Sequence, residues 1–324
     1  NDRFLATEGC AQICAMSDAP QLLIVADKSA PWTDAVMALS APHRRTLVIA
    51  PDTEIKTSAV EVVVGAPPDL AAIIPRCPQL RWVQSTWAGI DAIAHFASEA
   101  LQITPLKGVF GPAMTEYVMG WLLAIERNVI SRASHTQWTP SLEPRITDKR
   151  MGIMGTGDIG AAIALAAKSF GVEVIGLNSD GLAVDGFTAC YPSTDRLAFA
   201  ERLDYLVSVL PQTAQTDNLI DHEVLTRLNP GAIVINAGRG NAVVEADLIA
   251  SLNAGHVRAA VLDVFREEPL PPDDPLWSTP GVHITSHTAG PTPDEAIGEV
   301  FERNFKLYIA GEPLTDGVQP GRGY

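Results

Sequence analysis

Basic residues are scarce in this sequence. Lysine and arginine together number 23 against 38 aspartates and glutamates, which gives a formal net charge of -15. A nucleic-acid-binding protein needs a basic surface to neutralise phosphates, so this balance argues against such a partner. An acidic excess otherwise reports mainly on solubility.

Long apolar runs are also missing. The longest, from Tyr117 to Ile125, falls far short of the roughly 20 residues that a membrane-spanning helix needs. No basic stretch followed by an apolar one, the signature of a secretory signal, occurs near the start. We therefore expect a cytoplasmic protein with no membrane partner.

Cysteine is rare, and its spacing offers no metal site. The four cysteines, at positions 10, 14, 77 and 190, include no two pairs with the spacing of a zinc ligand set. Cys10 and Cys14 would lie one helical turn apart, but no second pair accompanies them. We expect unpaired thiols and no bound metal. Residues 1–15 precede the first convincing strand, and we expect them to be an extension outside the fold.

The length of 324 residues and the hydrophobic content of 47% predict a globular α/β protein of two domains. In the first third, short apolar strands alternate with helical segments, which indicates a small parallel sheet. A long helix is expected over 113–130. A last helix over 293–310 follows the final strand and would pack back onto the first sheet. We therefore predict a discontinuous, flavodoxin-like substrate domain made of residues 1–107 and 292–324.

A stricter alternation begins at Met151. Helical patterns separate most of six predicted strands, at 151–154, 172–177, 205–209, 232–236, 258–262 and 282–285. Six strands joined by right-handed crossovers make a doubly wound, Rossmann-type sheet. We predict that residues 108–291 form a dinucleotide-binding domain.

This domain opens on a G-x-G-x-x-G motif formed by Gly155, Thr156, Gly157, Asp158, Ile159 and Gly160. A plain turn between a strand and a helix would give the same pattern. Here the motif follows a strand and opens an alanine-rich helix, which is the context that a dinucleotide pyrophosphate requires. The glycines would permit a tight turn and a close approach of the backbone to the cofactor.

The end of the second strand leaves the choice of cofactor open. An NAD enzyme normally places Asp or Glu there to accept hydrogen bonds from the ribose. This chain has Asn178, followed by Ser179 and Asp180. Asn178 removes the charge that would repel a 2′-phosphate, yet no Lys or Arg follows to bind one. Both NAD(H) and NADP(H) stay open as cofactors.

Charged side chains follow three later strands: Arg239 the fourth, Glu268 the fifth and His287 the sixth. Each alone has a structural explanation, as a surface charge, a solvated loop residue and a core imidazole. Because parallel strands end along one edge of a sheet, the three can converge there as an anion clamp with an acid–base pair. Gly238 and Gly240, which flank the arginine, would let ligands approach its backbone.

The ordered motifs G-T-G-D-I-G, I-N-A-G-R-G, L-D-V-F-R-E-E-P-L-P and S-H-T-A-G resemble those of the D-isomer-specific 2-hydroxyacid dehydrogenase family. The likeness is greatest to its glyoxylate/hydroxypyruvate (2-ketoacid) reductase branch, and it covers nearly the whole chain from Leu22. It implies an oxidoreductase that transfers hydride between NAD(P)H and a small 2-keto acid, giving a D-2-hydroxy acid. It also implies that Arg239, Glu268 and His287 are catalytic.

The resemblance extends to binding residues. It implies that Trp87, Ala88, Gly89 and Arg239 bind the substrate, with the N–H groups of Ala88 and Gly89 facing its carboxylate. Cofactor-binding residues implied in addition to the glycine motif are Asn178, Ser179, Leu210, Pro211, Thr216, Ala237, Gly238, Asp263, His287, Ala289 and Gly290.

Some points stay open. Trp87 either narrows the substrate pocket or is a buried aromatic, and Trp138 either reaches across the interface of a homodimer or packs locally. Two other functions fit the same motifs: a non-catalytic, dinucleotide-sensing corepressor-like protein, and phosphoglycerate dehydrogenase. The formate dehydrogenase branch is disfavoured, because its members pair the histidine with Gln, and this chain has Glu268.

Overall fold

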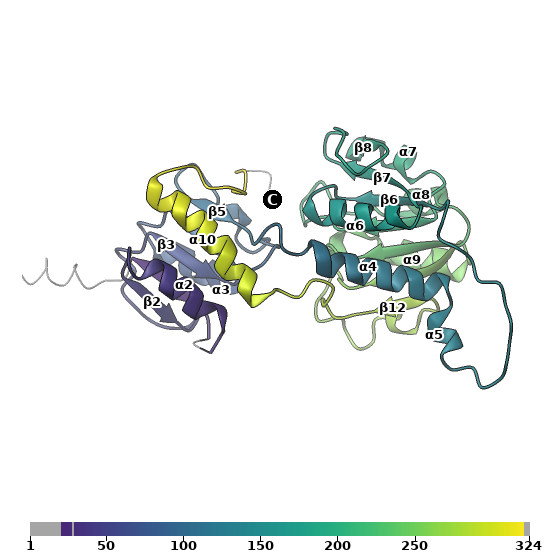
Figure 1. Cartoon of the computed structure of the whole chain (residues 1–324), viewed down its shortest axis with the longest axis horizontal. Coiled ribbons are helices and arrows are strands. Elements are labelled where there is room, and N and C mark those ends of the chain that lie inside the picture. Colours follow the sequence, from purple (N-terminus) through teal and green to yellow (C-terminus); the bar gives the residue numbers. More distant parts are fainter. Residues whose placement is uncertain (1–20, 28, 321–324) are drawn as a thin grey trace, which may run out of the picture. The chain divides into compact units, whose positions relative to one another are not determined.

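A computed structural model describes residues 21–27 and 29–320 of the chain (Figure 1). Two compact units are present. One ends at Val109 and resumes at Thr292, and the other runs from Phe110 to Pro291. The expectation that residues 1–15 form an extension, and with it Cys10 and Cys14, lies outside the described residues.

The first unit contains a parallel five-stranded sheet in the order β2-β1-β3-β4-β5. Its strands are β1 (Leu22–Val25), β2 (Thr46–Ile49), β3 (Val62–Gly65), β4 (Trp82–Ser85) and β5 (Gln102–Thr104), and its helices are α2 (Trp32–Ser40), α3 (Pro67–Ile73), η1 (Ile74–Arg76), η2 (Ala94–Phe96) and α10 (Asp294–Ala310). The sequences of β1 and β3 are continuous, fully buried apolar runs, as expected for parallel strands covered on both faces. This strand order is that of flavodoxin-like sheets.

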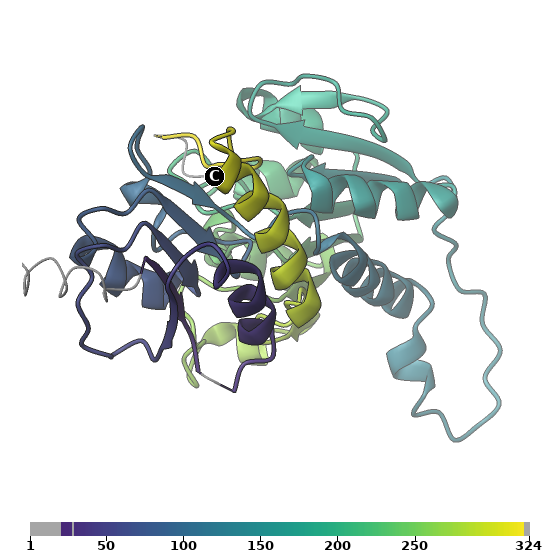
Figure 2. The ribbon, with the colours of Figure 1, turned by 60° about the vertical axis from the view of Figure 1, so that its left-hand side comes forward.

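Helix α10 joins the first unit although it comes near the end of the chain. Phe301 of α10 stacks on Trp82 of β4 with ring centroids 5.5 Å apart. Gly298 lies against Ala35 of α2, where an added Cβ would come within 3.1 Å of the alanine methyl group. The two helices lie side by side in Figure 2. The predicted last helix, and its return to the first sheet, are confirmed.

The second unit contains a parallel seven-stranded sheet in the order β12-β11-β10-β9-β6-β7-β8. Its strands are β6 (Arg150–Met154), β7 (Glu173–Asn178), β8 (Cys190–Pro192), β9 (Tyr205–Ser208), β10 (Ala232–Asn236), β11 (Val257–Leu262) and β12 (Val282–Ile284). From β8 to β11 this is the Rossmann order 3-2-1-4-5-6. The six predicted strands are all present. Strand β8 was not predicted, because it has only three residues and no apolar run.

The helices of the second unit are α4 (Gly111–Glu126), α5 (Val129–Arg132), α6 (Asp158–Ser169), η3 (Ser193–Asp195), α7 (Arg196–Ala200), α8 (His222–Arg227), η4 (Gly240–Ala242), α9 (Glu245–Asn253) and η5 (Pro275–Ser278). The predicted continuous helix over 113–130 is wrong at its end. Helix α4 stops because Asn128 adopts a left-handed conformation with φ 53°, which asparagine tolerates better than most residues. The buried carboxylate of Glu126 also anchors the helix end, since it accepts a hydrogen bond from Tyr205 Oη at 2.9 Å.

No helix in the described part of the chain is both long and apolar enough to cross a membrane. Between α5 and β6, residues 133–149 form neither helix nor strand, and they run outward from the sheet of their own unit (Figure 1).

Candidate active site

The glycine motif forms the turn between β6 and α6. Gly155 has a positive φ of 100°, and a Cβ on Gly160 would lie 1.9 Å from the carbonyl oxygen of Gly155. These two glycines are therefore required by the turn itself. Gly157 is different, because a Cβ there would meet no atom within 4 Å. The N-terminal end of α6, a helix of 12 residues, thus borders open space, and the N–H groups of its first turn suit the oxygens of a pyrophosphate.

Asn178, at the end of β7, holds the following loop. Its amide nitrogen donates to Thr156 Oγ1 at 3.2 Å and to the carbonyl of Leu182 at 2.9 Å. Its amide oxygen accepts from Gly181 N at 2.6 Å. Asp180 is exposed, and its carboxylate accepts from Leu182 N at 3.0 Å. At the end of β7, where NAD enzymes usually have Asp or Glu, this protein has Asn178, whose amide is hydrogen-bonded to the loop that follows.

Thr216 organises the loop after β9. Its hydroxyl donates to the carbonyl of Pro211 at 2.7 Å and accepts from Thr213 N at 2.9 Å. The side chain is buried. Its described contacts therefore shape the loop that begins at Leu210 and Pro211, for which sequence analysis predicted a role in cofactor binding.

The loop that carries Arg239 is held by Asn236, a buried residue at the end of β10. Asn236 donates to the carbonyl of Arg239 at 3.0 Å and accepts from Gly238 N at 3.3 Å. A Cβ on Gly238 would lie 2.6 Å from the backbone of Leu210, and one on Gly240 would lie 1.9 Å from that of Phe265. The glycines thus let this loop fit between the loops after β9 and β11. The two glycines are therefore needed for the packing of loops against each other, whereas the sequence predicted that they leave room for ligands.

Glu268 and His287 meet directly. Glu268 Oε2 lies 2.8 Å from Nδ1 of the imidazole. The other carboxylate oxygen accepts from Phe265 N at 2.9 Å. Because a carboxylate only accepts, Nδ1 carries a hydrogen and donates a hydrogen bond to Glu268. Nε2 is then the ring atom that can exchange a proton with a substrate. Both side chains are partly exposed.

Asp263 holds the loop that carries His287. This buried residue accepts hydrogen bonds from Thr285 Oγ1 at 2.5 Å, Thr288 N at 2.8 Å and Ala289 N at 2.9 Å. Its own carbonyl accepts from His287 N at 2.8 Å. The family resemblance implied that Asp263 binds the cofactor. Its described contacts fix the backbone on both sides of the histidine, whose φ is 55°.

Tyr117 of α4 extends this network, a role that its sequence context did not predict. Its hydroxyl lies 2.7 Å from Thr285 Oγ1. The hydrogen of Thr285 is used on Asp263, so Tyr117 donates. Burial raises the pKa of Tyr117 to about 12, and the phenol therefore keeps its proton at neutral pH. A donor chain from Tyr117 through Thr285 reaches Asp263.

The predicted substrate-binding residues 87–89 belong to the first unit, in the loop after β4. Trp87 is 46% exposed, so its interpretation as a buried aromatic is wrong. The backbone N and O of Trp87 both bond to Ser85 Oγ, at 2.9 and 2.8 Å. Within the described chain, the N–H groups of Ala88 and Gly89 donate no hydrogen bond.

The thiols and potential metal ligands form no centre in the described residues. Cys77 and Cys190 are free, and burial raises the pKa of the Cys77 thiol to about 11, so it stays protonated and unreactive at neutral pH. Across positions 21–27 and 29–320, no three His, Cys, Asp or Glu side chains are grouped so as to hold a metal ion.

A family model described as "D-isomer specific 2-hydroxyacid dehydrogenase, NAD binding domain" matches residues 119–289, which is more than half of the chain. The protein belongs to the D-isomer specific 2-hydroxyacid dehydrogenase family. The family and the Rossmann-type fold predicted from the sequence are confirmed. As a member of this family, the protein is an NAD(P)-dependent oxidoreductase.

Three relatives of the dehydrogenase family illustrate the likeness. Glyoxylate/hydroxypyruvate reductase A of Salmonella heidelberg (strain SL476) is 34% identical over 259 residues, which cover 76% of this chain and 82% of that protein. A family structure from Aeromonas salmonicida has a TM-score of 0.82 and 33% identity, covering 92% of this chain and 98% of its own. An NADPH-dependent glyoxylate/hydroxypyruvate reductase from Sinorhizobium meliloti, solved with NADP and sulfate, has a TM-score of 0.82 and 28% identity, covering 94% and 100%.

The two kinds of glycine in the motif predict opposite outcomes for two alanine variants. Gly157→Ala places a methyl group in the open space at the start of α6. We expect it to keep the melting temperature and to weaken NADH or NADPH binding by about ten-fold, or ~1.4 kcal/mol. Gly160→Ala must displace the carbonyl of Gly155, and we expect it to destabilise the fold by roughly 1–3 kcal/mol. Differential scanning fluorimetry and nucleotide fluorescence titration measure the two effects. Unweakened binding in Gly157→Ala would show that the dinucleotide does not use this space.

Proposed function

We propose that the protein reduces a small 2-keto acid, glyoxylate or hydroxypyruvate, to the corresponding D-2-hydroxy acid with NAD(P)H. The observation that supports this best is the 2.8 Å contact between Glu268 and His287, which directs Nδ1 at the carboxylate and leaves Nε2 as the ring atom that can exchange a proton with a substrate. The relatives named above are reductases of these substrates, and they do not favour a corepressor-like protein or phosphoglycerate dehydrogenase.

In this proposal, residues 1–107 and 292–324 bind the keto acid and residues 108–291 bind the dinucleotide. The N–H groups of Ala88 and Gly89 bind the substrate carboxylate, and Trp87 beside them limits its size. Residues of the second unit proposed to contact the cofactor are Gly155, Thr156, Gly157, Asp158, Ile159, Gly160, Asn178, Ser179, Leu210, Pro211, Thr216, Ala237, Gly238, Asp263, His287, Ala289 and Gly290.

The protein side chains then divide the chemistry. Arg239 carries a permanent charge on a planar fork, and it binds the keto acid and polarises the carbonyl group. Glu268 stabilises the protonated imidazole, and His287 gives the Nε2 proton to the carbonyl oxygen as it gains negative charge. The bound dinucleotide supplies the hydride to the carbonyl carbon.

The decisive experiment is a substrate panel run with both NADH and NADPH. We expect glyoxylate and hydroxypyruvate to be reduced. Between residues 169 and 195 the chain has no Lys or Arg to bind a 2′-phosphate, and Asn178 supplies no charge to repel one. We therefore propose that both cofactors are accepted with a modest preference at most. A preference for NADH above about a hundredfold, or ~2.7 kcal/mol, would show that Asp180 performs the task of the usual acid.

The proposed role of Arg239 predicts that lysine cannot replace it. Arg239→Lys keeps the charge and loses the fork, so kcat/KM for the keto acid should fall by about thirty- to several-thousand-fold, or ~2–5 kcal/mol. The dissociation constant of NADH or NADPH should stay unchanged. A matched control is Arg196→Lys on α7. The guanidinium of Arg196 pairs with Asp221 at 2.7 Å, and we expect this variant to keep the activity of the parent protein. Weakened dinucleotide binding with normal kcat/KM in Arg239→Lys would make Arg239 a phosphate ligand instead.

The contact between Glu268 and His287 predicts a slower reaction when the carboxylate is removed. Glu268→Gln keeps the shape of the side chain but replaces the carboxylate that accepts from Nδ1 with an amide. We expect kcat for keto-acid reduction to fall by about ten- to a hundredfold, while the dissociation constant of NADH stays unchanged. Steady-state rates and nucleotide titration measure the two quantities. A variant with the kcat of the parent protein would mean that Glu268 does not assist His287.

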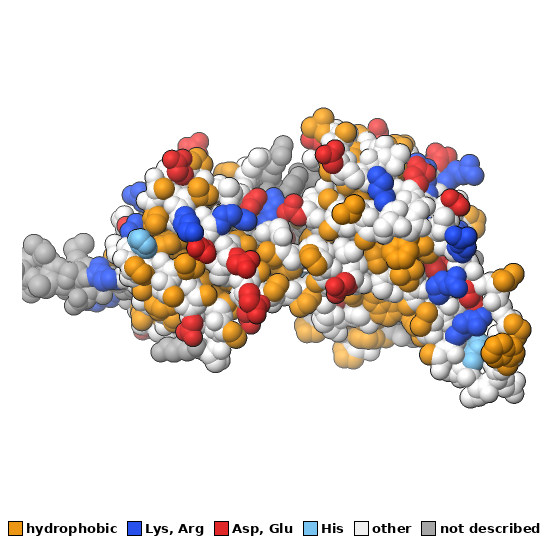
Figure 3. All heavy atoms as spheres, in the orientation of Figure 1, with side chains coloured by type: hydrophobic (Ala, Val, Ile, Leu, Met, Phe, Trp, Pro, Cys, Tyr) orange, Lys and Arg blue, Asp and Glu red, His pale blue; other side chains and the backbone are white. Residues whose placement is uncertain are grey.

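We also propose a homodimer, formed through α4, α5 and the segment 133–149. A hollow of about 360 Å³ on α4 and α5 is lined by Glu116, Tyr117, Gly120, Trp121, Ala124 and Ile130. Trp138 is 95% exposed, so its interpretation as a locally packed residue is wrong. Hydrophobic side chains are visible over α4 and along the outlying segment after it in Figure 3. Large exposed apolar patches mark interaction sites.

The proposed interface predicts the mass of a double variant. Trp138→Ser combined with Leu142→Ser removes two exposed apolar side chains, and we expect it to shift the protein from dimer to monomer in sedimentation velocity. Trp277→Ser is the control, because Trp277 is an exposed tryptophan of the same unit outside this segment. A double variant with the mass of the parent dimer would exclude this surface. The cytoplasmic location and the lack of a nucleic-acid partner stay predictions.

A further inference from the structure

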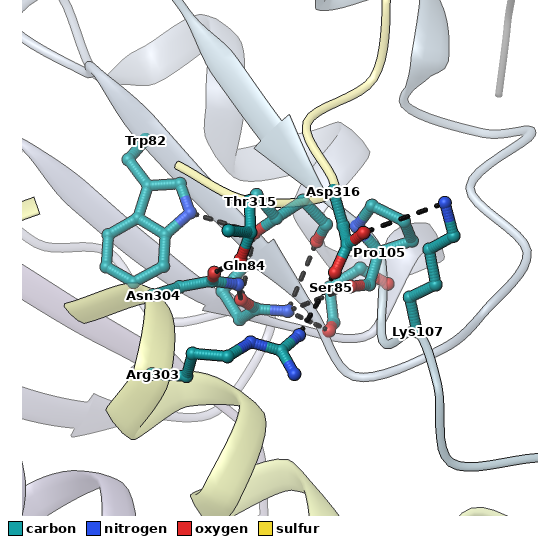
Figure 4. Close-up of polar contacts among 10 residues, drawn as sticks. Trp82, Gln84, Ser85, Pro105, Lys107, Arg303, Asn304, Thr315 and Asp316 are labelled. Atoms are coloured by element: carbon teal, nitrogen blue, oxygen red, sulfur yellow. Dashed lines mark hydrogen bonds and ion pairs between the residues drawn. The ribbon is translucent and has the colours of Figure 1, made fainter. Parts of the chain in front are cut away.

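Gln84 is a buried amide at the carboxyl end of β4. Trp82, two residues earlier, lies on the same face of the strand, and α10 covers that face. Both side chains are fully buried. A primary amide has two donor hydrogens and an oxygen that accepts two bonds, and burial without partners for them is costly. Figure 4 shows that the surroundings of Gln84 supply these partners.

The amide nitrogen of Gln84 binds the points at which two neighbouring strands end. Its two hydrogens face three carbonyls, those of Ser85 at 2.9 Å, Thr104 at 3.2 Å and Pro105 at 3.4 Å, so that one hydrogen is shared between two acceptors. Ser85 is the last residue of β4, and Thr104 is the last of β5. One side chain therefore connects the starts of both following loops.

The amide oxygen of Gln84 is held by residues far away in the sequence. It accepts from Asn304 Nδ2 at 2.9 Å and from Thr104 Oγ1 at 2.8 Å. Asn304 is fully buried on α10, and its own amide oxygen accepts from Thr315 Oγ1 at 2.9 Å. If the Gln84 amide were flipped, its nitrogen would face the nitrogen of Asn304, and its oxygen would face the carbonyls of Ser85 and Thr104. The network thus fixes one orientation of the amide.

The loop that starts at Ser85 contains the proposed carboxylate donors. The hydroxyl of Ser85 bonds to both the N and the O of Trp87, and Leu106 N donates to the same Trp87 carbonyl at 2.9 Å. Leu106 follows Pro105, whose carbonyl Gln84 holds. The backbone just before Ala88 and Gly89 is therefore tied on both sides to groups that Gln84 connects.

Surface charges near the network contribute less. Asp316 pairs with Arg303 at 3.1 Å and with Lys107 at 3.7 Å (Figure 4). All three side chains are a third to a half exposed, and such solvent-exposed ion pairs contribute little to stability. Removing one partner from a buried amide leaves unsatisfied polar groups in the interior, which is more costly. The buried amides rather than the ion pairs decide the geometry.

We propose that Gln84, Asn304 and Thr315 are positioning residues for the keto acid. They hold the backbone before Ala88 and Gly89 so that these two N–H groups converge on the substrate carboxylate. Through Thr315, the segment after α10 becomes part of the substrate-binding machinery, although it lies more than 200 residues from Gln84 in sequence. This inference rests on the proposed function, because it takes Ala88 and Gly89 as ligands of a carboxylate.

Three variants of the full-length protein test the network: Gln84→Met, Asn304→Leu and Thr315→Val. Each removes hydrogen bonds at nearly constant volume. We expect the KM for glyoxylate and hydroxypyruvate to rise about ten-fold in the first two and about three-fold in Thr315→Val, where the loss acts through Asn304. The dissociation constant of NADH should not change, because the proposed dinucleotide site lies in the other unit. Thr315→Ser keeps the hydroxyl group and should restore the parent KM.

Ser40→Ala is the matched control for stability. Ser40 is a fully buried polar residue of the same unit, and its hydroxyl bonds to the carbonyl of Val36 and to Thr46. It should lose stability and keep the KM. Gln84→Met changes the centre of the network and is used if the variant folds. Thr315→Val changes only its edge and tests the same role with less risk of unfolding.

The outcomes separate the two levels of inference. If the parent protein reduces keto acids but Thr315→Val and Asn304→Leu lower only the melting temperature, as Ser40→Ala does, the network is structural and the positioning role is refuted. If the parent protein neither reduces a 2-keto acid nor binds oxamate, a non-reacting analogue, in the presence of NADH, the proposed function fails and the inference fails with it. A rise in KM with an equal loss of NADH affinity would also overturn it.

Discussion

Asp263 is buried at the end of β11, and its carboxylate accepts three hydrogen bonds from the loop that carries His287. Burying such a group without partners would cost several kcal/mol, so it must be met by donors. Two of these donors are backbone N–H groups directly after His287. The histidine keeps a left-handed backbone conformation, which is unfavourable for a residue with a side chain. The geometry of the Glu268–His287 pair depends on this one buried carboxylate.

Close backbone packing is the second constraint on the proposed site. Gly238 and Gly240 leave no room for a Cβ on the sides that face Leu210 and Phe265. The loops after β9, β10 and β11 therefore interlock, and Phe265, against which Gly240 packs, donates its N–H to Glu268. A side chain at Gly240 would separate the loop of Arg239 from that of Glu268, and one at Gly238 would separate it from the loop after β9. The tightly packed backbones of these loops therefore hold both Arg239, the proposed substrate ligand, and Glu268, the proposed partner of His287.

In both units a buried polar side chain fixes the loops that follow parallel strands, but the chemical group differs. In the second unit a charged group, Asp263, fixes a loop through backbone donors. In the first unit a neutral amide, Gln84, fixes two loops through backbone carbonyls. Both residues lie at the carboxyl ends of parallel strands, where doubly wound sheets place their ligands. In each case the buried side chain has hydrogen-bond partners and fixes the backbone beside a proposed functional group. That group is His287 in the second unit and the N–H groups of Ala88 and Gly89 in the first.

The sequence by itself determined the fold class, the family and most strands, because apolar β-branched runs, the G-x-G-x-x-G turn and charged residues after strands are local patterns. It also brought Glu268 and His287 to one edge of the sheet, since parallel strands end on the same side. Only the tertiary structure decided what holds them. The contacts of Thr285 with Tyr117 and of Asn304 with Gln84 join residues 168 and 220 positions apart, and no local pattern encodes such pairings. The short edge strand β8 was missed because its pairing with β7, rather than intrinsic propensity, stabilises it. The end of α4 was missed because it depends on the left-handed conformation of Asn128 and on the contact of Glu126 with the distant Tyr205, neither of which interrupts the apolar pattern.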